Sequence, residues 1–163
     1  MSMTSGSGMN PSDVRRNNED VSFNCTEGDL LQIFRECYCH WAVCVGRGRV
    51  VHLVGEGKVL EDRFWDVVGV SFAKINNYLD GKLNVLPKEE IVKRARSKLG
   101  PMKYNAVSYN CEHFATWCRY GVARSEQVVT AAAAGITAAG VMSGNSILVG
   151  LGGLLGMNSM THN

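Results

Sequence analysis

The sequence lacks the charge excess and the basic clusters that are typical of nucleic-acid-binding proteins. Its 17 Lys and Arg residues nearly balance 15 Asp and Glu residues, which leaves a formal net charge of +2 at pH 7. No basic run and no strip of basic and aromatic residues occurs along the 163 residues. Phosphate backbones are bound chiefly by clustered Lys and Arg, so we expect no nucleic-acid partner.

An apolar leader is also absent, because residues 1–20 are polar or charged. A secretory signal peptide contains an apolar stretch of about 7–15 residues, so a cytosolic setting is expected. The six cysteines stand at irregular spacing, and the cytosolic setting predicts that they are reduced. Residues 1–24 contain too few apolar groups to offset the entropy lost on ordering, which predicts a disordered N-terminal segment.

The rest of the composition predicts one small domain. With 45% hydrophobic residues, the chain can bury one core of ordinary size. The sequence predicts a strand over 30–35 and further strand-like runs that include 67–72. Pro87 is expected to open a helix that stops at Gly100, with a basic face toward solvent. The apolar face of this helix is expected to hold Ile91, Ala95 and Leu99.

The C-terminal segment has no charged residue from Gln127 to the end. Residues 128–157 are mostly apolar or small, and they are enough to span a bilayer core of about 30 Å. This pattern predicts a single-pass tail anchor, and the positive-inside tendency of Arg119 and Arg124 places the preceding domain in the cytoplasm. The alternative is a segment that lies on the membrane, but such helices usually carry a strongly charged face. Gly140 and Gly144 form a small-xxx-small pair that could pack against a partner helix. Such pairs are common in Gly-rich segments, so the oligomeric state stays open.

The strongest chemical signal is a cysteine at the predicted start of a helix. Apolar residues recur at helical spacing after Cys111, and Gly121 supplies a left-handed stop, so a helix is predicted over about 111–120. Asn110 is its expected N-cap. Free N–H groups and the positive end of the helix dipole favour the thiolate, which makes Cys111 a candidate nucleophile.

A nucleophilic cysteine needs a base, and the chain contains four histidines. His113 lies two residues past the cysteine, roughly 200° around the helix, so we expect it to face away from the thiol. His162 stands among the last polar residues without structural context. The remaining two, His40 and His52, fall in apolar runs separated by residues 46–49, which predicts a β-hairpin.

The register of this hairpin decides whether the two histidines can meet. A two-residue turn alone would pair His52 with Val43 and place the histidines on opposite faces of the sheet. A three-residue loop or a bulge would pair His52 with Ala42 and place both histidines on one face. The catalytic interpretation requires the second register, in which one histidine acts as base and the other holds it.

The order and spacing of four motifs resemble one known family. The motifs are His40-Trp-Ala, Val51-His-Leu, Asn110-Cys-Glu-His-Phe and residues 119–128. Together they are similar to the H-Ras-like suppressor family of phospholipase/acyltransferases, a branch of the lecithin:retinol acyltransferase group. The resemblance covers roughly residues 28–128. It implies an α+β, circularly permuted papain-like fold in which an antiparallel sheet packs on helices, followed here by the hydrophobic tail helix.

The resemblance also implies a site and an activity. Cys111 would be the nucleophile, His40 its base and His52 the partner of that base, in a catalytic domain over 25–127. The implied enzyme is a phospholipase A1/A2 and N- or O-acyltransferase that works through an acyl-thioester. Its substrates would be membrane glycerophospholipids, with phosphatidylcholine as acyl donor and phosphatidylethanolamine or a lysophospholipid as acceptor. Neither a cofactor nor a metal is expected.

Three departures from the family pattern leave these residues untouched. Cys44 stands where an aromatic residue is usual, Ala115 replaces the commoner valine, and the stretch from His52 to Cys111 is shorter. The sequence leaves two rival interpretations. A membrane-anchored interaction protein could keep the fold without the chemistry, although the intact cysteine and histidines argue against it. A zinc site is disfavoured by ligand spacing. Its candidate ligands are Cys37, Cys39, His40, Cys111 and His113.

Overall fold

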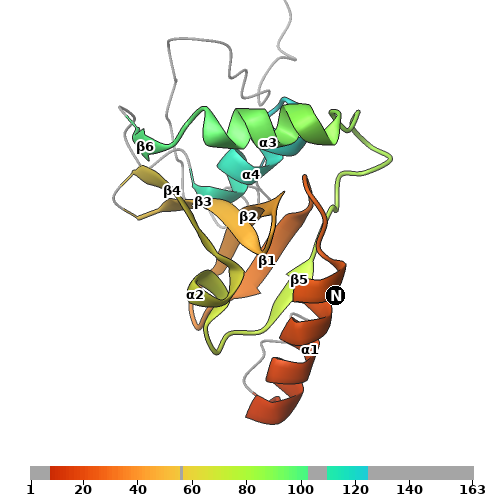
Figure 1. The fold of residues 1–163 in the computed structure, drawn as a ribbon, viewed down its shortest axis with the longest axis vertical. Helices are drawn as coiled ribbons and strands as arrows, with labels where there is room; N and C mark the ends of the chain where they lie inside the picture. The colour runs from red at the N-terminus through yellow and green to blue at the C-terminus, as the bar shows by residue number, and fades with distance from the viewer. Residues whose placement is uncertain (1–7, 56, 103–109, 125–163) are drawn as a thin grey trace, which may run out of the picture.

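The computed structural model describes residues 8–55, 57–102 and 110–124 as a mixed α+β domain (Figure 1). Its six-stranded sheet has the order β5-β1-β2-β3-β4-β6, and each described ladder is antiparallel. The strands are β1 (Leu30–Phe34), β2 (Cys39–Gly46), β3 (Arg49–Val54), β4 (Lys58–Arg63), β5 (Ala73–Ile75) and β6 (Gly100–Pro101). The helices are α1 (Pro11–Asn24), α2 (Phe64–Val68), α3 (Lys88–Arg96) and α4 (Cys111–Tyr120).

The two faces of the sheet are covered by different helices. Alternate residues of a strand point to opposite faces, and β2 follows this rule. Trp41 and Val43 pack in one buried cluster with side chains of α3 and α4. Ala42 and Cys44 pack in a second cluster with side chains of α1 and α2. Figure 1 shows α3 and α4 together at one end of the domain, with α1 and α2 at the other.

The hairpin between β2 and β3 has the register that the catalytic interpretation requires. Arg47 (φ 54°) and Gly48 (φ 66°) are both left-handed, as a two-residue type I′ turn demands. A bulge between Cys44 and Gly46 then shifts the ladder by one residue, so that His52 pairs with Ala42. The predicted placement of both histidines on one face is confirmed, and it arises from a bulge added to a two-residue turn.

The prediction of disorder for residues 1–24 is wrong where the structure describes them. Residues 11–24 form α1, whose first turn is capped by the Asn10 side chain, which accepts a hydrogen bond from the Ser12 N–H. The Asn18 side chain donates to the Ser71 carbonyl at 2.8 Å and accepts from the Ala73 N–H at 3.1 Å. Buried amide contacts to the β5 edge therefore order a helix that has few apolar groups. Residues 1–7 lie outside the described residues.

The prediction that the cysteines are reduced is wrong for two of them. Cys25, directly after α1, forms a disulfide with Cys44 in β2, and their Cα atoms are 6.7 Å apart. This separation lies within the usual range for a disulfide. The pairing depends on how α1 docks against the sheet, which cysteine spacing does not reveal. The other cysteines of the described residues, Cys37, Cys39, Cys111 and Cys118, are not in a disulfide.

The other predicted elements are partly correct. The strand predicted over 30–35 is present as β1, but residues 67–72 are not a strand, because α2 continues to Val68 and Gly69 ends it with a φ of 57°. Ile91 and Ala95 are buried on α3 as predicted. Leu99 is 46% exposed, and Gly100 pairs with Val59 in β6 because α3 ends at residue 96.

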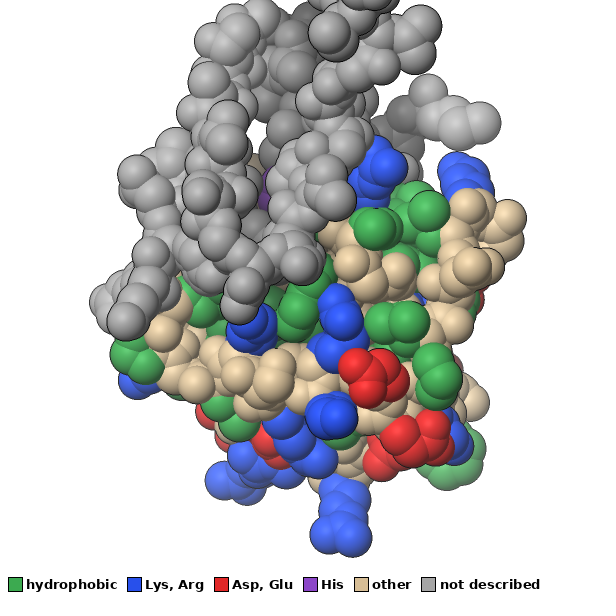
Figure 2. Space-filling view, turned by 90° about the horizontal axis from the view of Figure 1, so that it is seen from above, with side chains coloured by type: hydrophobic (Ala, Val, Ile, Leu, Met, Phe, Trp, Pro, Cys, Tyr) green, Lys and Arg blue, Asp and Glu red, His purple; other side chains and the backbone are tan. Residues whose placement is uncertain are grey.

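The basic face of α3 is partly engaged in contacts within the domain. The Arg94 guanidinium lies 4.0 Å from the centre of the Trp117 ring, and Arg96 donates to the carboxylate of Glu61 at 3.0 Å. Figure 2 looks onto this end of the molecule, where basic side chains are interspersed with acidic and hydrophobic ones. Within the described ranges, no helix is long and apolar enough to cross a membrane. The predicted anchor over 128–157 lies outside those ranges.

Candidate active site

Cys111 is the first residue of α4, and the start of this helix is fixed by a capping box. The Asn110 side chain accepts hydrogen bonds from the N–H groups of Glu112 and His113, each at 3.0 Å. The His113 ring nitrogen Nδ1 in turn accepts from the Asn110 N–H at 3.3 Å. Gly121, with a φ of 77°, ends the helix. The predicted helix, cap and stop are all confirmed, and His113 is buried in the capping interaction.

The cysteine lies where β2 and β3 separate. The described pairing of these two strands reaches from the hairpin turn to Ala42 opposite His52, and the first residues of β2 continue past it. Cys111 meets the start of β2, which is paired with β1 but extends beyond its pairing with β3, and the thiol donates to the Cys39 carbonyl at a sulfur-to-oxygen distance of 3.7 Å. The cysteine is therefore held against the strand that carries His40.

The electrostatics of Cys111 differ from the expectation drawn from its helix position. Burial raises the pKa of its thiol above the ordinary value, and the nearby charge of Glu112 acts in the same direction. Hydrogen bonds from the backbone N–H groups of Trp41 and Glu112 lower the pKa, but they do not outweigh burial. The sulfur is consequently a neutral thiol at pH 7, and it must lose its proton during the reaction.

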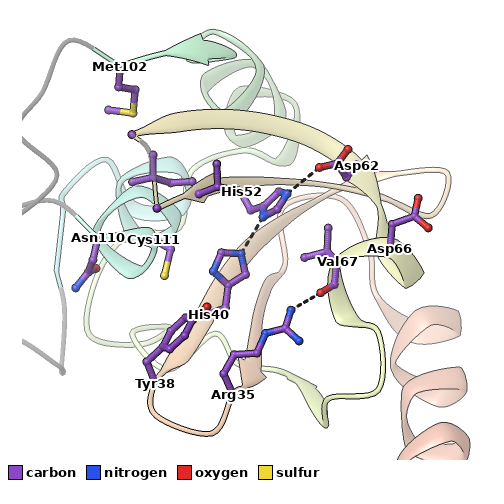
Figure 3. Close-up of a pocket in the computed structure, with 14 residues that line it drawn as sticks. Arg35, Tyr38, His40, His52, Asp62, Asp66, Val67, Met102, Asn110 and Cys111 are labelled. Atoms are coloured by element: carbon purple, nitrogen blue, oxygen red, sulfur yellow. Dashed lines mark hydrogen bonds and ion pairs between the residues drawn. The ribbon is translucent and has the colours of Figure 1, made fainter.

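The two predicted histidines are in direct contact. His40 Nε2 lies 2.8 Å from His52 Nδ1, and both side chains are buried. Burial, followed by the influence of His52 and of Arg35, lowers the pKa of His40 to about 4. His40 is therefore neutral at pH 7 and able to accept a proton. Figure 3 shows its ring between Cys111 and His52.

A carboxylate that the sequence does not predict extends the pair of histidines into a row of three hydrogen-bonded side chains. The other ring nitrogen of His52, Nε2, lies 3.0 Å from Asp62 Oδ2 in β4. Leu60 pairs with His52 across the β3–β4 ladder, and Asp62 is two residues further along the same face. The pairing of β3 with β4 is not among the predictions from the sequence, and the alternation of residues 58–63 after Gly55 and Gly57 is the sequence signal that could have indicated it.

These side chains line one cavity of about 510 Å³. Arg35 and Tyr38 stand on one side of His40, and the Arg35 guanidinium donates to the Val67 and Val68 carbonyls at the end of α2. Leu53 contributes to an apolar side of the same cavity, which Val54 and Met102 also line. The cavity thus offers polar and apolar walls on either side of the thiol and the imidazole.

All three predicted site residues, Cys111, His40 and His52, border this cavity. His162 lies outside the described residues. No group of three or more His, Cys, Asp and Glu side chains suited to a metal ion occurs in the described part of the chain. The arrangement combines a thiol, a neutral imidazole and a second imidazole bound to a carboxylate, which are the parts required for acyl transfer through a covalent intermediate.

Comparison with known proteins identifies a matching family and several similar proteins. A model of the lecithin retinol acyltransferase family matches residues 23–124. Phospholipase A and acyltransferase 3 of Pongo abelii is 40% identical over 132 residues, which cover 67% of this chain and 82% of the relative. The Homo sapiens protein of the same name is 41% identical over 120 residues, covering 62% and 74% respectively. Phospholipase A and acyltransferase 2 of Homo sapiens is 38% identical over 140 residues, covering 74% and 86%.

Proposed function

Because the chain belongs to the lecithin retinol acyltransferase family, we propose that it is a thiol-dependent enzyme that removes fatty acyl groups from glycerophospholipids. The single observation that carries the thiol mechanism is the shared cavity of Cys111 and the hydrogen-bonded pair of His40 and His52. The names of the relatives support phospholipase and acyltransferase activities for the family.

In the first step, His40 takes the proton of the Cys111 thiol while the sulfur attacks the ester carbonyl of the lipid. A neutral thiol and a neutral imidazole require this transfer to accompany attack, since a thiolate is not formed in advance. The developing oxyanion needs N–H donors. Asn110 already accepts hydrogen bonds from the N–H groups of Glu112 and His113, and we assign the N–H of Cys111, the first residue of α4, as the donor to the oxyanion.

In the second step, the tetrahedral intermediate collapses and the lysophospholipid leaves with a proton from the His40 imidazolium. The acyl group remains on Cys111 as a thioester. Attack by water then gives phospholipase A1 or A2 activity, depending on which ester was cleaved. Attack by the amine of phosphatidylethanolamine gives N-acyl transfer, and attack by a lysophospholipid hydroxyl gives O-acyl transfer. His40 accepts the proton of each acceptor in turn.

We extend the proposal to the organisation of the chain. The thiol helix follows the histidine strands in the sequence, which suits a circularly permuted papain-like arrangement. Residues 25–127 would form the catalytic domain on the cytoplasmic side of a membrane, and residues 128–157 would anchor it there. The uncharged, largely apolar sequence of the tail supports the anchor.

The function is tested by product analysis with full-length protein in detergent micelles. Phosphatidylcholine labelled in either acyl chain is supplied with and without phosphatidylethanolamine. We expect free fatty acid and lysophospholipid from the wild type, together with an N-acylated product when the amine is present. Cys111→Ser should release none of these, whereas Cys37→Ser, a change at an exposed free thiol, should keep wild-type rates. A wild type without lipid products would contradict the proposed enzyme and favour a non-catalytic membrane protein.

A further inference from the structure

Asp62 is the one acidic side chain of the described residues that is hydrogen-bonded to the histidine pair. We propose that Asp62 is a positioning residue that acts through His52 to set the proton pattern in which His40 can serve as base. The inference rests on the proposed function, and it adds Asp62 as a fourth residue to the set of Cys111, His40 and His52.

The geometry that supports this role is a diagonal row across three adjacent strands. His40 belongs to β2, His52 to β3 and Asp62 to β4, and each is offset by two residues from the position directly opposite its neighbour. The two contacts measure 2.8 Å and 3.0 Å. Six consecutive residue pairs join β3 to β4, so the carboxylate is held beside the imidazole by a continuous ladder.

The hydrogen-bonding capacities of these groups allow only one arrangement of protons when all three are in their neutral-pH forms. An ionised carboxylate can only accept, so His52 must carry its proton on Nε2 and donate it to Asp62. His52 Nδ1 is then an acceptor, and it receives the Nε2 proton of His40. The lone pair of His40 is consequently on Nδ1, the nitrogen left to take a proton from the thiol of Cys111.

The charge of Asp62 also has a function once the proton has moved. The His40 imidazolium forms in a buried site next to the Arg35 guanidinium, and both features disfavour a second positive charge. The carboxylate provides negative charge at the other end of the row. His52 is 8% exposed as a side chain and Asp62 43%, so the imidazole is shielded while the carboxylate reaches solvent.

A second acid, Asp66, also lines the cavity, so the control acid is taken from outside it: Asp13 of α1 pairs with Arg16 at 3.9 Å, and both side chains are exposed. Asp66 is on α2, where it pairs with Arg63 at 3.3 Å, and both side chains are largely exposed. In Figure 3 its carboxylate is turned away from the two histidines. Asp62 and Asp66 therefore lie close together in the fold with the same chemistry, but only Asp62 contacts the row.

The kinetic test compares Asp62→Asn, Asp62→Glu and Asp13→Asn in the full-length protein with phosphatidylcholine in micelles. An amide can donate to His52 Nε2 and so reverse the row, which removes the lone pair from His40 Nδ1. We expect Asp62→Asn to lower kcat by about 10- to 100-fold with little change in KM. Asp62→Glu should keep most of the wild-type rate, and Asp13→Asn, a change outside the cavity, should stay within about twofold of the wild type.

The pH profile separates positioning from a structural role. The charged or titratable groups around the pair are Arg35, Tyr38, Asp62, Asp66 and Cys111. Loss of the Asp62 charge should move the acid limb of kcat to lower pH, because the protonated pair is no longer stabilised. Simple loosening of the fold would lower the rate without moving this limb. Wild-type kcat and an unchanged profile in Asp62→Asn would overturn the proposal.

A measurement without substrate distinguishes failure of this inference from failure of the proposed function. Nitrogen-15 NMR of labelled histidines in the full chain identifies which ring nitrogen carries the proton at neutral pH. We expect the proton on Nε2 of both His40 and His52 in the wild type, and on Nδ1 of both in Asp62→Asn. A wild-type His52 protonated on Nδ1 would overturn the assignment whether or not the protein hydrolyses lipid. If Asp62→Asn does not fold, the protonation of His52 in the wild-type spectrum alone decides the assignment.

Discussion

His40 and His52 share a hydrogen bond of 2.8 Å across neighbouring strands because a bulge between Cys44 and Gly46 shifts the hairpin register by one residue. Without the shift, His52 would pair with Val43, and its imidazole would point to the opposite face of the sheet. The bulge therefore joins the base to its partner. The alignment of His52 with Asp62 on the next strand is set separately, by the uninterrupted ladder between β3 and β4.

The state of the thiol predicts how Cys111 reacts with an alkylating reagent. Burial raises its pKa, so little thiolate is present near neutral pH. We expect the rate of Cys111 modification by iodoacetamide to increase steadily with pH through 9 and to show no plateau around 6–7. Mass spectrometry of the modified peptide separates Cys111 from the exposed thiol of Cys37. A plateau below pH 7 would instead indicate a preformed thiolate-imidazolium pair.

The depressed pKa of His40 predicts a loss of stability on acidification. Its pKa is about 4 in the folded protein against about 6.5 when unfolded, so between these values the unfolded chain binds more protons. The free energy of unfolding should therefore be highest above pH 6.5 and fall by up to about 3 kcal/mol as the pH drops to 4. His113, whose pKa burial also lowers, adds to this slope.

Urea denaturation at a series of pH values measures this effect. His40→Gln removes one titrating group from the buried pair, so its free energy of unfolding should vary less between pH 4 and 6.5 than that of the wild type. Arg15→Gln, which changes an exposed helix pair with Glu19, serves as the control and should keep the wild-type slope. Equal slopes in His40→Gln and the wild type would show that His40 is not neutral and buried.

The disulfide predicts a separate contribution to stability. Cys25 and Cys44 are 19 residues apart, and closing a loop of this size in the unfolded chain is worth about 3 kcal/mol. The double variant Cys25→Ala/Cys44→Ala should lower the free energy of unfolding by about this amount. Cys37→Ser, which removes an exposed free thiol, should leave it within about 0.5 kcal/mol of the wild type. Equal stability of all three proteins would mean that the two thiols are not bonded in solution.

The sequence predicts the elements whose signals are local. Helix α4 is predicted because its cap at Asn110, its apolar spacing and its stop at Gly121 lie within the helix or next to it. Helix α1 is missed because its order depends on contacts of Asn18 with Ser71 and Ala73, more than fifty residues away.

The candidate site also contains residues with a local sequence signal and residues whose role depends on distant contacts. Cys111, His40 and His52 can be selected from residue type and spacing, and a resemblance to a family assigns their roles. The bulge that brings the histidines together ends at Gly46, which has a φ of 86°, so the glycines that flank Arg47 permit the bulge but do not by themselves select this register. Asp62 is identified only once the register of β3 and β4 is known.

The most direct test of the central claim is the mass of the protein during turnover. Full-length wild-type protein is mixed with phosphatidylcholine in micelles, quenched in acid and analysed by intact and peptide mass spectrometry. We predict the mass of one fatty acyl group, located on Cys111 and released by neutral hydroxylamine, and no such mass on Cys111→Ser. An acyl group on another residue, or turnover of the lipid by Cys111→Ser at the wild-type rate, would contradict the account.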